Sequence, residues 1–245
     1  MINKLRSRIE GVARDMGWSD GLLYLAARAV RSITLGRVEL RKYYFVSQAV
    51  AERPLLPKNR GATITVERID RSHPFISRFP RPAHVIAARF DSNAECFLAT
   101  KDDEFVGFLW LQRGTYREDE VRCLFMPLPA AETVWDFDVH VEPTHRSSFA
   151  FARLWDTANQ YLRDTGITWS VSRISAFNPG SINSHARLGA FPIGSAVFLN
   201  GREWQLMLSP LSSVHFSCGE KSVPEIAMAA TLESRKPYRR FNRLK

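Results

Sequence analysis

The chain has 245 residues, of which 45% are hydrophobic and 24% are charged, the composition of a globular protein with a sizeable core. Disorder along the whole chain is therefore excluded, and no apolar run approaches the roughly 18 residues that a membrane-spanning helix needs. The first ten residues are rich in charge and contain no apolar signal segment. Because only three scattered cysteines are present, we expect a reduced, cytoplasmic protein.

The net charge of +9 is unevenly distributed along the chain. Residues 1–60 hold 12 Lys/Arg against 5 Asp/Glu, residues 61–210 hold 15 against 17, and residues 211–245 hold 7 against 3. We therefore expect a basic helical N-terminal extension (1–60), a nearly neutral domain (61–210) and a basic, flexible C-terminal tail (211–245). Such extensions suit contact with an anionic membrane surface or polymer, which would make the protein peripheral to a membrane; the alternative is a solvated surface and a loose tail.

The apolar spacing within Trp18–Thr34 predicts an amphipathic helix, which packs on the protein's own core or lies on a membrane. From residue 61 the elements follow closely. They are a strand at 63–69, short helices at 73–79 and 83–90, a hairpin of 96–100 with 105–112, a strand at 133–141, a long helix at 147–166, a strand at 169–175, a helix at 182–188, and a hairpin of 193–199 with 203–208 around a type I′ turn at Asn200-Gly201. This order predicts a mixed α/β sheet with helices on both faces. Residues 234–245 show no periodic core face.

The strand before the long helix breaks the rule that a central strand is apolar on both sides. Its even positions Asp136, Asp138 and His140 would place two carboxylates and an imidazole on one face. Since an unpaired buried carboxylate costs several kcal/mol, this face should line a cleft. The alternative is an exposed face, or acids paired with arginines such as Arg122 and Arg173.

The turn after this strand leads directly into the N-terminus of the long helix, an arrangement that favours anion binding. The residues of the turn, Val141-x-Pro143-x-x-Arg146, followed by Leu154 and Gly166, resemble motif A of the Gcn5-related N-acetyltransferase superfamily. The resemblance implies that the turn cradles the pyrophosphate of acetyl-CoA or another acyl-CoA, the co-substrate. It implies the cofactor-binding residues Val139, Val141, His145, Arg146, Ser147, Ser148 and Asn178.

A second stretch, from Asn178 to Leu188-Gly189, is similar to motif B of the same superfamily. The resemblance covers about residues 63–208 and implies the acyltransferase fold. His185 stands where the family has a tyrosine that protonates the leaving thiolate, and histidine can do this work. The alternative is a histidine on a helix surface.

The resemblance also implies a general base on the strand before motif A. Asp136, Asp138 and His140 are the candidates, and among them histidine has the ordinary pKa closest to neutral pH, where a general base works best. A backbone N–H near Val139 is expected to polarise the thioester carbonyl.

Two departures from motif A leave an alternative open. Phe149 and Phe151 occupy positions where the family has glycines that let the phosphates approach the backbone. We expect an acyl-CoA dependent N-acyltransferase that uses no metal and acts on a small-molecule amine, such as an amino sugar or nucleotide sugar. The alternatives are a related binding module that has lost catalysis, and a glycosyltransferase-like metal site built on Asp136-x-Asp138-x-His140.

Overall fold

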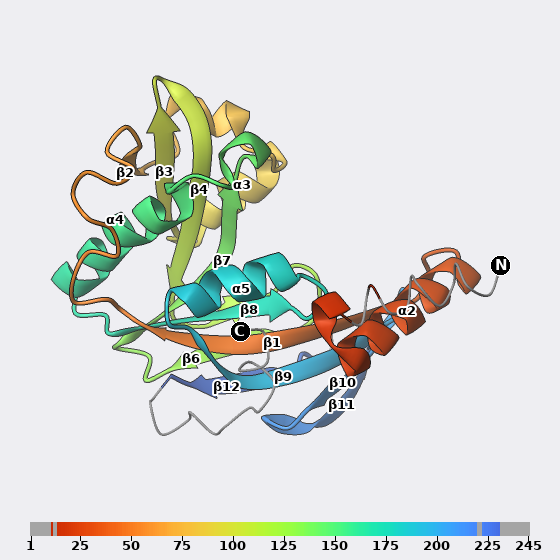
Figure 1. The fold of residues 1–245 in the computed structure, drawn as a ribbon. Coiled ribbons are helices and arrows are strands. Elements are labelled where there is room, and N and C mark those ends of the chain that lie inside the picture. The colour runs from red at the N-terminus through yellow and green to blue at the C-terminus, as the bar shows by residue number, and fades with distance from the viewer. Residues whose placement is uncertain (1–10, 12–13, 220–221, 231–245) are drawn as a thin grey trace. The chain divides into compact units, whose positions relative to one another are not determined.

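The computed structural model describes residue 11, residues 14–219 and residues 222–230. The expectation that residues 234–245 lack structure lies outside these residues. The chain divides into two compact units, each assembled from separate stretches of sequence (Figure 1). Unit 1 holds Met1–Ser47, Thr115–Met126 and Arg173–Lys245, and unit 2 holds Gln48–Gly114 and Pro127–Ser172.

Unit 2 contains a mixed sheet in the order β8-β7-β4-β3-β2, in which β7 and β8 run parallel and the other neighbours run antiparallel. The elements are β2 (Thr65–Ile69), the 3₁₀ helix η1 (Pro74–Arg78), α3 (Ala83–Asp91), β3 (Glu95–Lys101), β4 (Glu104–Arg113), β7 (Thr133–Val141), the 3₁₀ helix η2 (Pro143–His145), α4 (Ala150–Asp164) and β8 (Trp169–Ser175), whose last three residues belong to unit 1. All the elements predicted between residues 63 and 175 are present in the predicted order.

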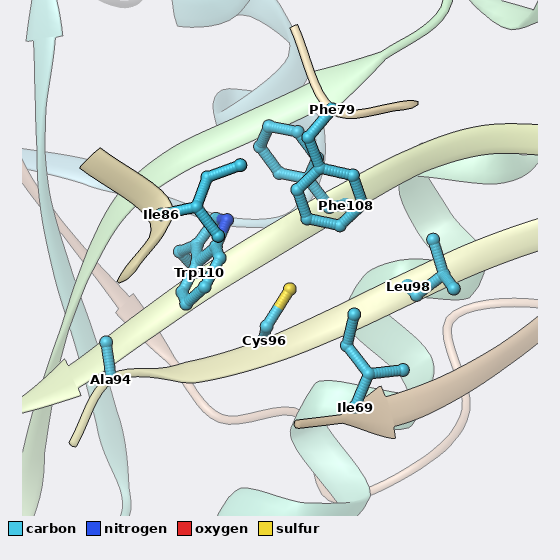
Figure 2. Packing of buried hydrophobic residues seen from close by; sticks show 8 residues of the cluster. All are labelled: Ile69, Phe79, Ile86, Ala94, Cys96, Leu98, Phe108 and Trp110. Carbon is cyan, nitrogen blue, oxygen red and sulfur yellow. The ribbon is translucent and has the colours of Figure 1, made fainter. Parts of the chain in front are cut away.

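Helices cover both faces of this sheet, as the sequence predicts. On one face, α4 packs against β3, where the rings of Tyr161 and Phe97 meet edge-on with centroids 5.5 Å apart. On the other face, η1 and α3 close over a buried cluster (Figure 2). The cluster consists of Ile69, Phe79, Ile86, Ala94, Cys96, Leu98, Phe108 and Trp110.

The long helix α4 forms because its apolar residues recur every three to four positions. Ala150, Leu154, Ala158 and Leu162 are all buried and lie on one side of the helix. The helix ends before Gly166, whose φ of 75° is the left-handed conformation that glycine adopts without strain. The stripe fixes which side of α4 faces the sheet, and thereby the direction in which the preceding turn approaches the helix.

Unit 1 contains an antiparallel sheet in the order β11-β10-β9-β1 and a three-stranded sheet in the order β12-β6-β5. Its elements are α2 (Trp18–Ile33), β1 (Glu39–Ala49, whose last two residues lie in unit 2), β5 (Tyr116–Arg117), β6 (Leu124–Leu128, which also ends in unit 2), α5 (Pro179–Arg187), β9 (Phe191–Asn200), β10 (Trp204–Ser209), β11 (Ser212–Cys218) and β12 (Glu225–Ala229). Phe45 and Phe125, from β1 and β6, pack edge-on at 5.3 Å inside this unit.

Five strands lie where no strand was predicted, and two of them, β5 and β6, fall between the predicted hairpin and the predicted strand 133–141. β1 lies within residues 1–60, which we expected to be helical, and β11 and β12 lie within 211–245, where we expected a flexible tail. Residues 43–48 of β1 are continuously buried, so the strand does not show the alternation of apolar and polar residues by which half-buried strands are recognised. In β11 the apolar residues Val214 and Phe216 are exposed, so the alternation of buried apolar and exposed polar residues is absent there as well.

The hairpin of β9 with β10 is present, but its turn differs from the expected one. The N–H of Gly201 donates to the carbonyl of Trp204 at 2.8 Å, which makes Arg202 and Glu203 the two central residues. A side chain at position 201 would meet the indole of Trp204 at 2.2 Å. Gly201 is therefore needed for the close approach of Trp204 and does not form the centre of a type I′ turn.

Candidate functional site

The strand β7 carries the predicted base candidates, and its register with β4 corrects their arrangement. Trp110 faces Asp138, but the next residue of β4, Leu111, faces Asp136, so Phe137 is the extra residue of a β-bulge. Because a bulge shifts the alternation by one, Asp136 lies on the α4 side of the sheet, whereas Asp138 and His140 lie on the side of η1 and α3. The expectation that all three share one face is wrong.

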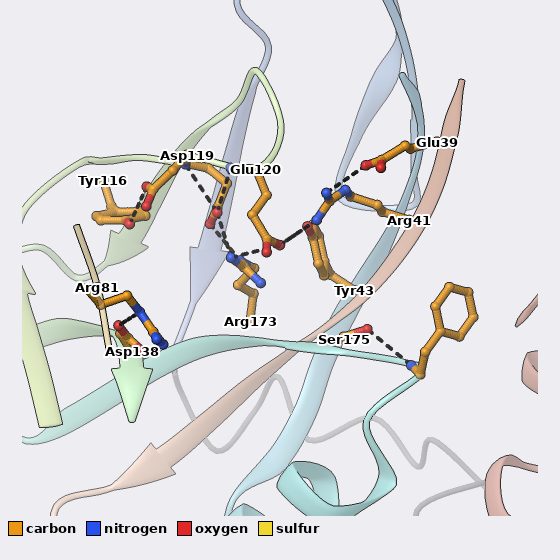
Figure 3. A network of polar contacts seen from close by, with 12 residues as sticks. Glu39, Arg41, Tyr43, Arg81, Tyr116, Asp119, Glu120, Asp138, Arg173 and Ser175 are labelled. Atoms are coloured by element: carbon orange, nitrogen blue, oxygen red, sulfur yellow. Dashed lines mark hydrogen bonds and ion pairs between the residues drawn. The ribbon is translucent and has the colours of Figure 1, made fainter. Parts of the chain in front are cut away.

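Asp138 is held by two arginines from the helical segment that covers its face. Arg81 forms a bidentate pair with the carboxylate at 2.8 and 2.7 Å (Figure 3). Arg89 donates to Oδ2 at 2.7 Å. The guanidinium of Arg89 also stacks on the rings of Trp110 and Phe137. The side chain of Asp138 is 10% exposed. Both carboxylate oxygens thus accept hydrogen bonds from arginine, which is the paired arrangement that the sequence left as an alternative.

The partners of Asp138 are not the arginines named from the sequence. Arg122 donates its backbone N–H to the side chain of Gln205, and Arg173 pairs with Glu118, all within unit 1. Arg81 and Arg89 come from a segment about 50 to 60 residues before Asp138. No local spacing indicates such a pairing, so sequence reasoning missed it.

His140, two residues farther along β7, is paired with a carboxylate that sequence reasoning also missed. Its Nε2 lies 3.1 Å from Oε1 of Glu142, and its ring stacks on Phe105 and Phe108, with centroids 6.2 and 5.4 Å away. His140 and Glu142 are separated by one residue at the end of the strand, and this spacing was the available signal. A carboxylate beside an imidazole can orient the ring and stabilise its protonated form, so the pair suits a general base.

The end of β7 is held firmly against β4. The backbone N–H of Glu142 donates to the carbonyl of Val106 at 2.9 Å. A Cβ atom at Gly107 would lie 2.3 Å from the carbonyl oxygen of His140, so only glycine allows this approach. The position of the His140 backbone therefore depends on Gly107.

The other edge of β7 is paired with β8 over only part of its length. The parallel ladder runs from Thr133 opposite Trp169 to Asp136 opposite Ser172, and β7 continues for five more residues to Val141. Val139 and Val141, which the resemblance places at the cofactor, lie in this continuation. Their proposed contacts with a ligand stay a prediction.

The turn after β7 is compact and exposes basic and hydroxyl side chains. Arg146 is exposed and donates from Nε to the carbonyl of Val141 at 3.3 Å, and Ser147 is exposed as well. The hydroxyl of Ser148 donates to the carbonyl of His145 at 2.6 Å and accepts from the N–H of Ala150 at 3.2 Å. One of the free N–H groups at the start of α4 is therefore satisfied by Ser148 instead of remaining open for an anion.

The first turn of α4 is partly covered by the segment before β2. Phe149 occupies the position next to the helix, and the guanidinium of Arg60 stacks on its ring at 5.5 Å. A Cβ atom at Gly61 would lie 2.9 Å from Cβ of Phe149 and 3.0 Å from Cγ of Arg153. Side-chain cations therefore surround the turn at which the resemblance expects glycines and bare backbone.

The two remaining candidates, Asn178 and His185, belong to unit 1. Asn178 caps α5, because its Oδ1 accepts from the N–H of Ser181 at 3.1 Å. His185 lies on the same helix, with Nδ1 2.9 Å from the carbonyl oxygen of Ser181. It is buried, so the alternative of a histidine on a helix surface is wrong. Its role as an acid and the role of Asn178 at a cofactor stay predictions.

Comparisons with known proteins find similarity only among solved structures, since no family model and no curated protein matches the chain. A functionally unknown conserved protein from Staphylococcus epidermidis ATCC 12228 is 10% identical over 69% of this chain and 65% of its own length, with a TM-score of 0.47. A Gcn5-related N-acetyltransferase from Sphaerobacter thermophilus is 16% identical over 71% of this chain and 56% of its own length, with a TM-score of 0.47. An aminoglycoside acetyltransferase from an uncultured soil metagenomic sample, in complex with sisomicin, is 12% identical over 52% of this chain and 88% of its own length, with a TM-score of 0.39. The chain spans less than two thirds of the length of the first two of these proteins.

The elements from β2 to β10 follow the order of the Gcn5-related N-acetyltransferase fold. The residues that resemble motif A lie on β7, the turn after it and α4, and those that resemble motif B lie from the start of α5 to the residues just after it. The strands β5 and β6 lie between the hairpin of β3 with β4 and the strand β7.

Unit 1 carries a second charged network, which joins the segment between β5 and β6 to β1 and to the end of β8 (Figure 3). Arg173 binds Glu118 through two hydrogen bonds of 2.6 Å and reaches Glu120 at 3.1 Å. Tyr43 donates to Glu120 at 2.6 Å. Burial raises the pKa of Tyr43, while burial of Arg173 is outweighed by the Glu118 carboxylate, which raises the pKa of that guanidinium. Tyr43 therefore stays neutral and Arg173 stays charged, and their contacts with Glu118 and Glu120 hold the segment between β5 and β6 in place.

The alternative of a metal held by Asp136, Asp138 and His140 is wrong, because the bulge separates Asp136 from the other two and two arginines occupy Asp138. Among the residues that the structure describes, no group of three His, Cys, Asp or Glu side chains could hold a metal ion. Within the same stretches, no helix is long and apolar enough to cross a bilayer.

Proposed function

We propose that this protein is an N-acyltransferase that moves an acyl group from acyl-CoA, with acetyl-CoA as the simplest donor, to the amine of a small molecule such as an amino sugar or nucleotide sugar. The observation that carries the proposal is the His140–Glu142 pair at the end of β7, directly before a basic turn into α4. Because function does not follow from fold alone, the proposal rests on these side chains and on the motif resemblance together.

The reaction that this pair would serve is aminolysis of a thioester. The amine nitrogen attacks the carbonyl carbon, a C–N bond forms, the C–S bond breaks, and the oxyanion is stabilised by a backbone N–H, for which we propose Val139. His140 takes the proton that the amine loses, and Glu142 stabilises the imidazolium that results. The thiolate regains a proton from an acid, for which His185 is the candidate.

The three candidates for the base are now unequal. Among the described residues, Glu142 is the charged partner of His140, whereas both oxygens of Asp138 are engaged by arginines. We therefore assign Asp138 the positioning of Arg81 and Arg89. Asp136 is buried on the opposite face. The proposed base is therefore His140.

The basic groups around the turn fit the anionic part of the donor. Arg146 and Arg60 are both exposed beside the start of α4, and the positive end of the helix dipole adds to their attraction for phosphate. Phe149 keeps a phosphate from the helix backbone at the position where glycine would admit it. We propose that the arginine side chains replace the backbone cradle here.

Titration calorimetry with acetyl-CoA and with CoA tests the binding half of the proposal. Arg146→Ala should weaken binding by about 1.5 to 3 kcal/mol, the value of one charge-assisted phosphate contact. The exposed Arg78, at the end of η1, provides a matched control, and Arg78→Ala should bind like the wild type. Absence of binding by the wild type at millimolar ligand would overturn the enzymatic proposal.

Release of free thiol from acetyl-CoA in the presence of a panel of amines tests the chemistry. His140→Gln should lower kcat/KM by roughly 10² to 10⁴ and remove the acidic limb of its pH profile. Glu142→Gln should lower kcat by about tenfold while leaving the affinity for CoA unchanged. If both variants keep wild-type rates at every pH, the pair is structural.

A binding module that has lost acyl-CoA catalysis is the second candidate. Phe149 at the glycine position, packed under Arg60 and Gly61, is the observation that favours it. The calorimetry decides between the two, because a module of this kind would show no heat with acetyl-CoA.

A further inference from the structure

The helix α2 has two apolar faces, and the described residues of unit 1 pack against one of them. The inner face is anchored by Asp20, which accepts hydrogen bonds from Lys42 and from the hydroxyl of Tyr44, both at 2.6 Å. Tyr24 packs edge-on against Phe177 at 5.5 Å. These contacts fix the rotation of α2 about its own axis, and therefore determine which residues point away from the unit.

The residues that point away form a second apolar stripe, which we name the outer face. It consists of Trp18, Leu22, Ala26, Ala29 and Ile33, whose spacing of three and four places them on one side of the helix. All five are exposed, and the exposed fractions of Trp18, Leu22 and Ile33 are 62%, 57% and 82%. Three large apolar side chains exposed on one face of a helix, with alanines between them, mark a surface that contacts something else.

The charges that α2 itself exposes are positive, while the exposed Asp15 lies three residues before the stripe begins. Arg28 and Arg31 are exposed on α2, and Arg37 is exposed just after it. Glu39 lies 3.7 Å from Arg31, too far for a strong pair. Asp20, the one carboxylate within the helix, is turned inward onto Lys42. A ligand for this surface must therefore be apolar in its interior and negatively charged at its boundary.

We propose that the outer face of α2 docks on the surface of an anionic lipid bilayer, with the helix axis in the plane of the membrane. Trp18, Leu22 and Ile33 would enter the boundary between headgroups and acyl chains, and the three arginines would contact the lipid phosphates. A second copy of the chain fits less well, because α2 exposes no carboxylate with which the arginines of the other copy could pair, Asp20 being turned inward onto Lys42. This inference is independent of the proposed acyl transfer.

Co-sedimentation with vesicles tests the proposal. The full chain should sediment with vesicles of phosphatidylcholine containing about 30% phosphatidylglycerol, and should stay in solution with pure phosphatidylcholine or at high salt, because the attraction to anionic lipid is electrostatic. Replacing Trp18, Leu22 and Ile33 by Gln should lower the partition coefficient at least tenfold. Replacing Arg28, Arg31 and Arg37 by Gln should lower it by about 10- to 100-fold.

Two matched controls separate this surface from exposed residues in general. Val214→Thr with Phe216→Thr removes apolar side chains of similar exposure on β11, and Arg53→Gln with Arg78→Gln and Arg117→Gln removes three exposed arginines elsewhere. Both control proteins should sediment like the wild type, and circular dichroism should show that all variants are folded.

Three results would overturn the proposal. The first is equal sedimentation with neutral and anionic vesicles. The second is full retention of binding by the variants in Trp18, Leu22 and Ile33 or in the three arginines of α2. The third is a dimer in analytical ultracentrifugation that the outer-face variant converts to a monomer, because a second copy would then occupy the face.

Discussion

Replacement of Asp138 by Asn decides whether this carboxylate positions the arginines or acts as the base. The substitution keeps the volume of the side chain and removes its charge. Arg81 and Arg89 then share one amide oxygen in place of two carboxylate oxygens that accept three hydrogen bonds of 2.7 to 2.8 Å. The side chain of Arg89 is 11% exposed, so water cannot replace the lost partner.

The size of the effect follows from this burial. Breaking a buried ion pair by removing one partner costs about 3 to 5 kcal/mol. Because Arg81 is 33% exposed and partly solvated, the lower end of this range, about 3 kcal/mol, applies. For a protein of this size, that corresponds to a fall in Tm of about 6 to 12 °C.

Thermal unfolding followed by tryptophan fluorescence measures this change, since Trp110 lies under the guanidinium of Arg89. Asp164→Asn is the control, because Asp164 is an exposed side chain on α4 bonded to Gln160, and its Tm should stay within about 2 °C of the wild type. A fall in Tm of less than about 2 °C for Asp138→Asn would refute the positioning role. Loss of turnover without loss of stability would make Asp138 the base instead.

Three further predictions concern other titratable groups. His185→Gln should lower turnover by roughly 10² to 10⁴ with unchanged affinity for CoA, and unchanged turnover would make His185 structural. Burial alone would raise the pKa of Glu120, but Arg173 and its neighbours outweigh burial and lower it. Glu120 therefore stabilises the fold at pH values above its pKa in the unfolded chain, about 4.3, and this contribution is lost as pH falls through its lower pKa in the folded state. Urea titrations should show that the free energy of unfolding of Glu120→Gln depends less on acid pH than that of the wild type. Burial raises the pKa of Cys123 to about 12, and Cys96 is buried as well. A disulfide reagent should therefore titrate one thiol per native chain, that of the exposed Cys218. Two or three reacting thiols would contradict this burial.

The local patterns of the chain were sufficient to predict the framework of the site. The strands 133–141 and 169–175 have the predicted bounds, and the long helix has the predicted apolar stripe and glycine end. Each depends on neighbouring residues in sequence, whose periodicity is visible without knowledge of the fold.

The arrangement of side chains at the site was less predictable. The bulge at Phe137 arises from the register of β7 against β4, a contact between segments far apart in the chain, and it moves Asp136 to the other face. Likewise, the pairing of Asp138 with Arg81 and Arg89 depends on where η1 and α3 pack. Glu142 could have been recognised, because its spacing from His140 is local.

The position of β1 has a practical consequence for expression of this protein. The strand pairs with β9 from Glu39 opposite Asn200 to Ser47 opposite Phe191, and its Tyr43 and Phe45 are fully buried. A fragment that begins at residue 61, where the charge distribution suggests a boundary, would leave β9 with a row of unpaired N–H and C=O groups, which invites aggregation between chains. Shortened versions of the protein should therefore begin before Glu39, and a purification tag is best placed ahead of α2.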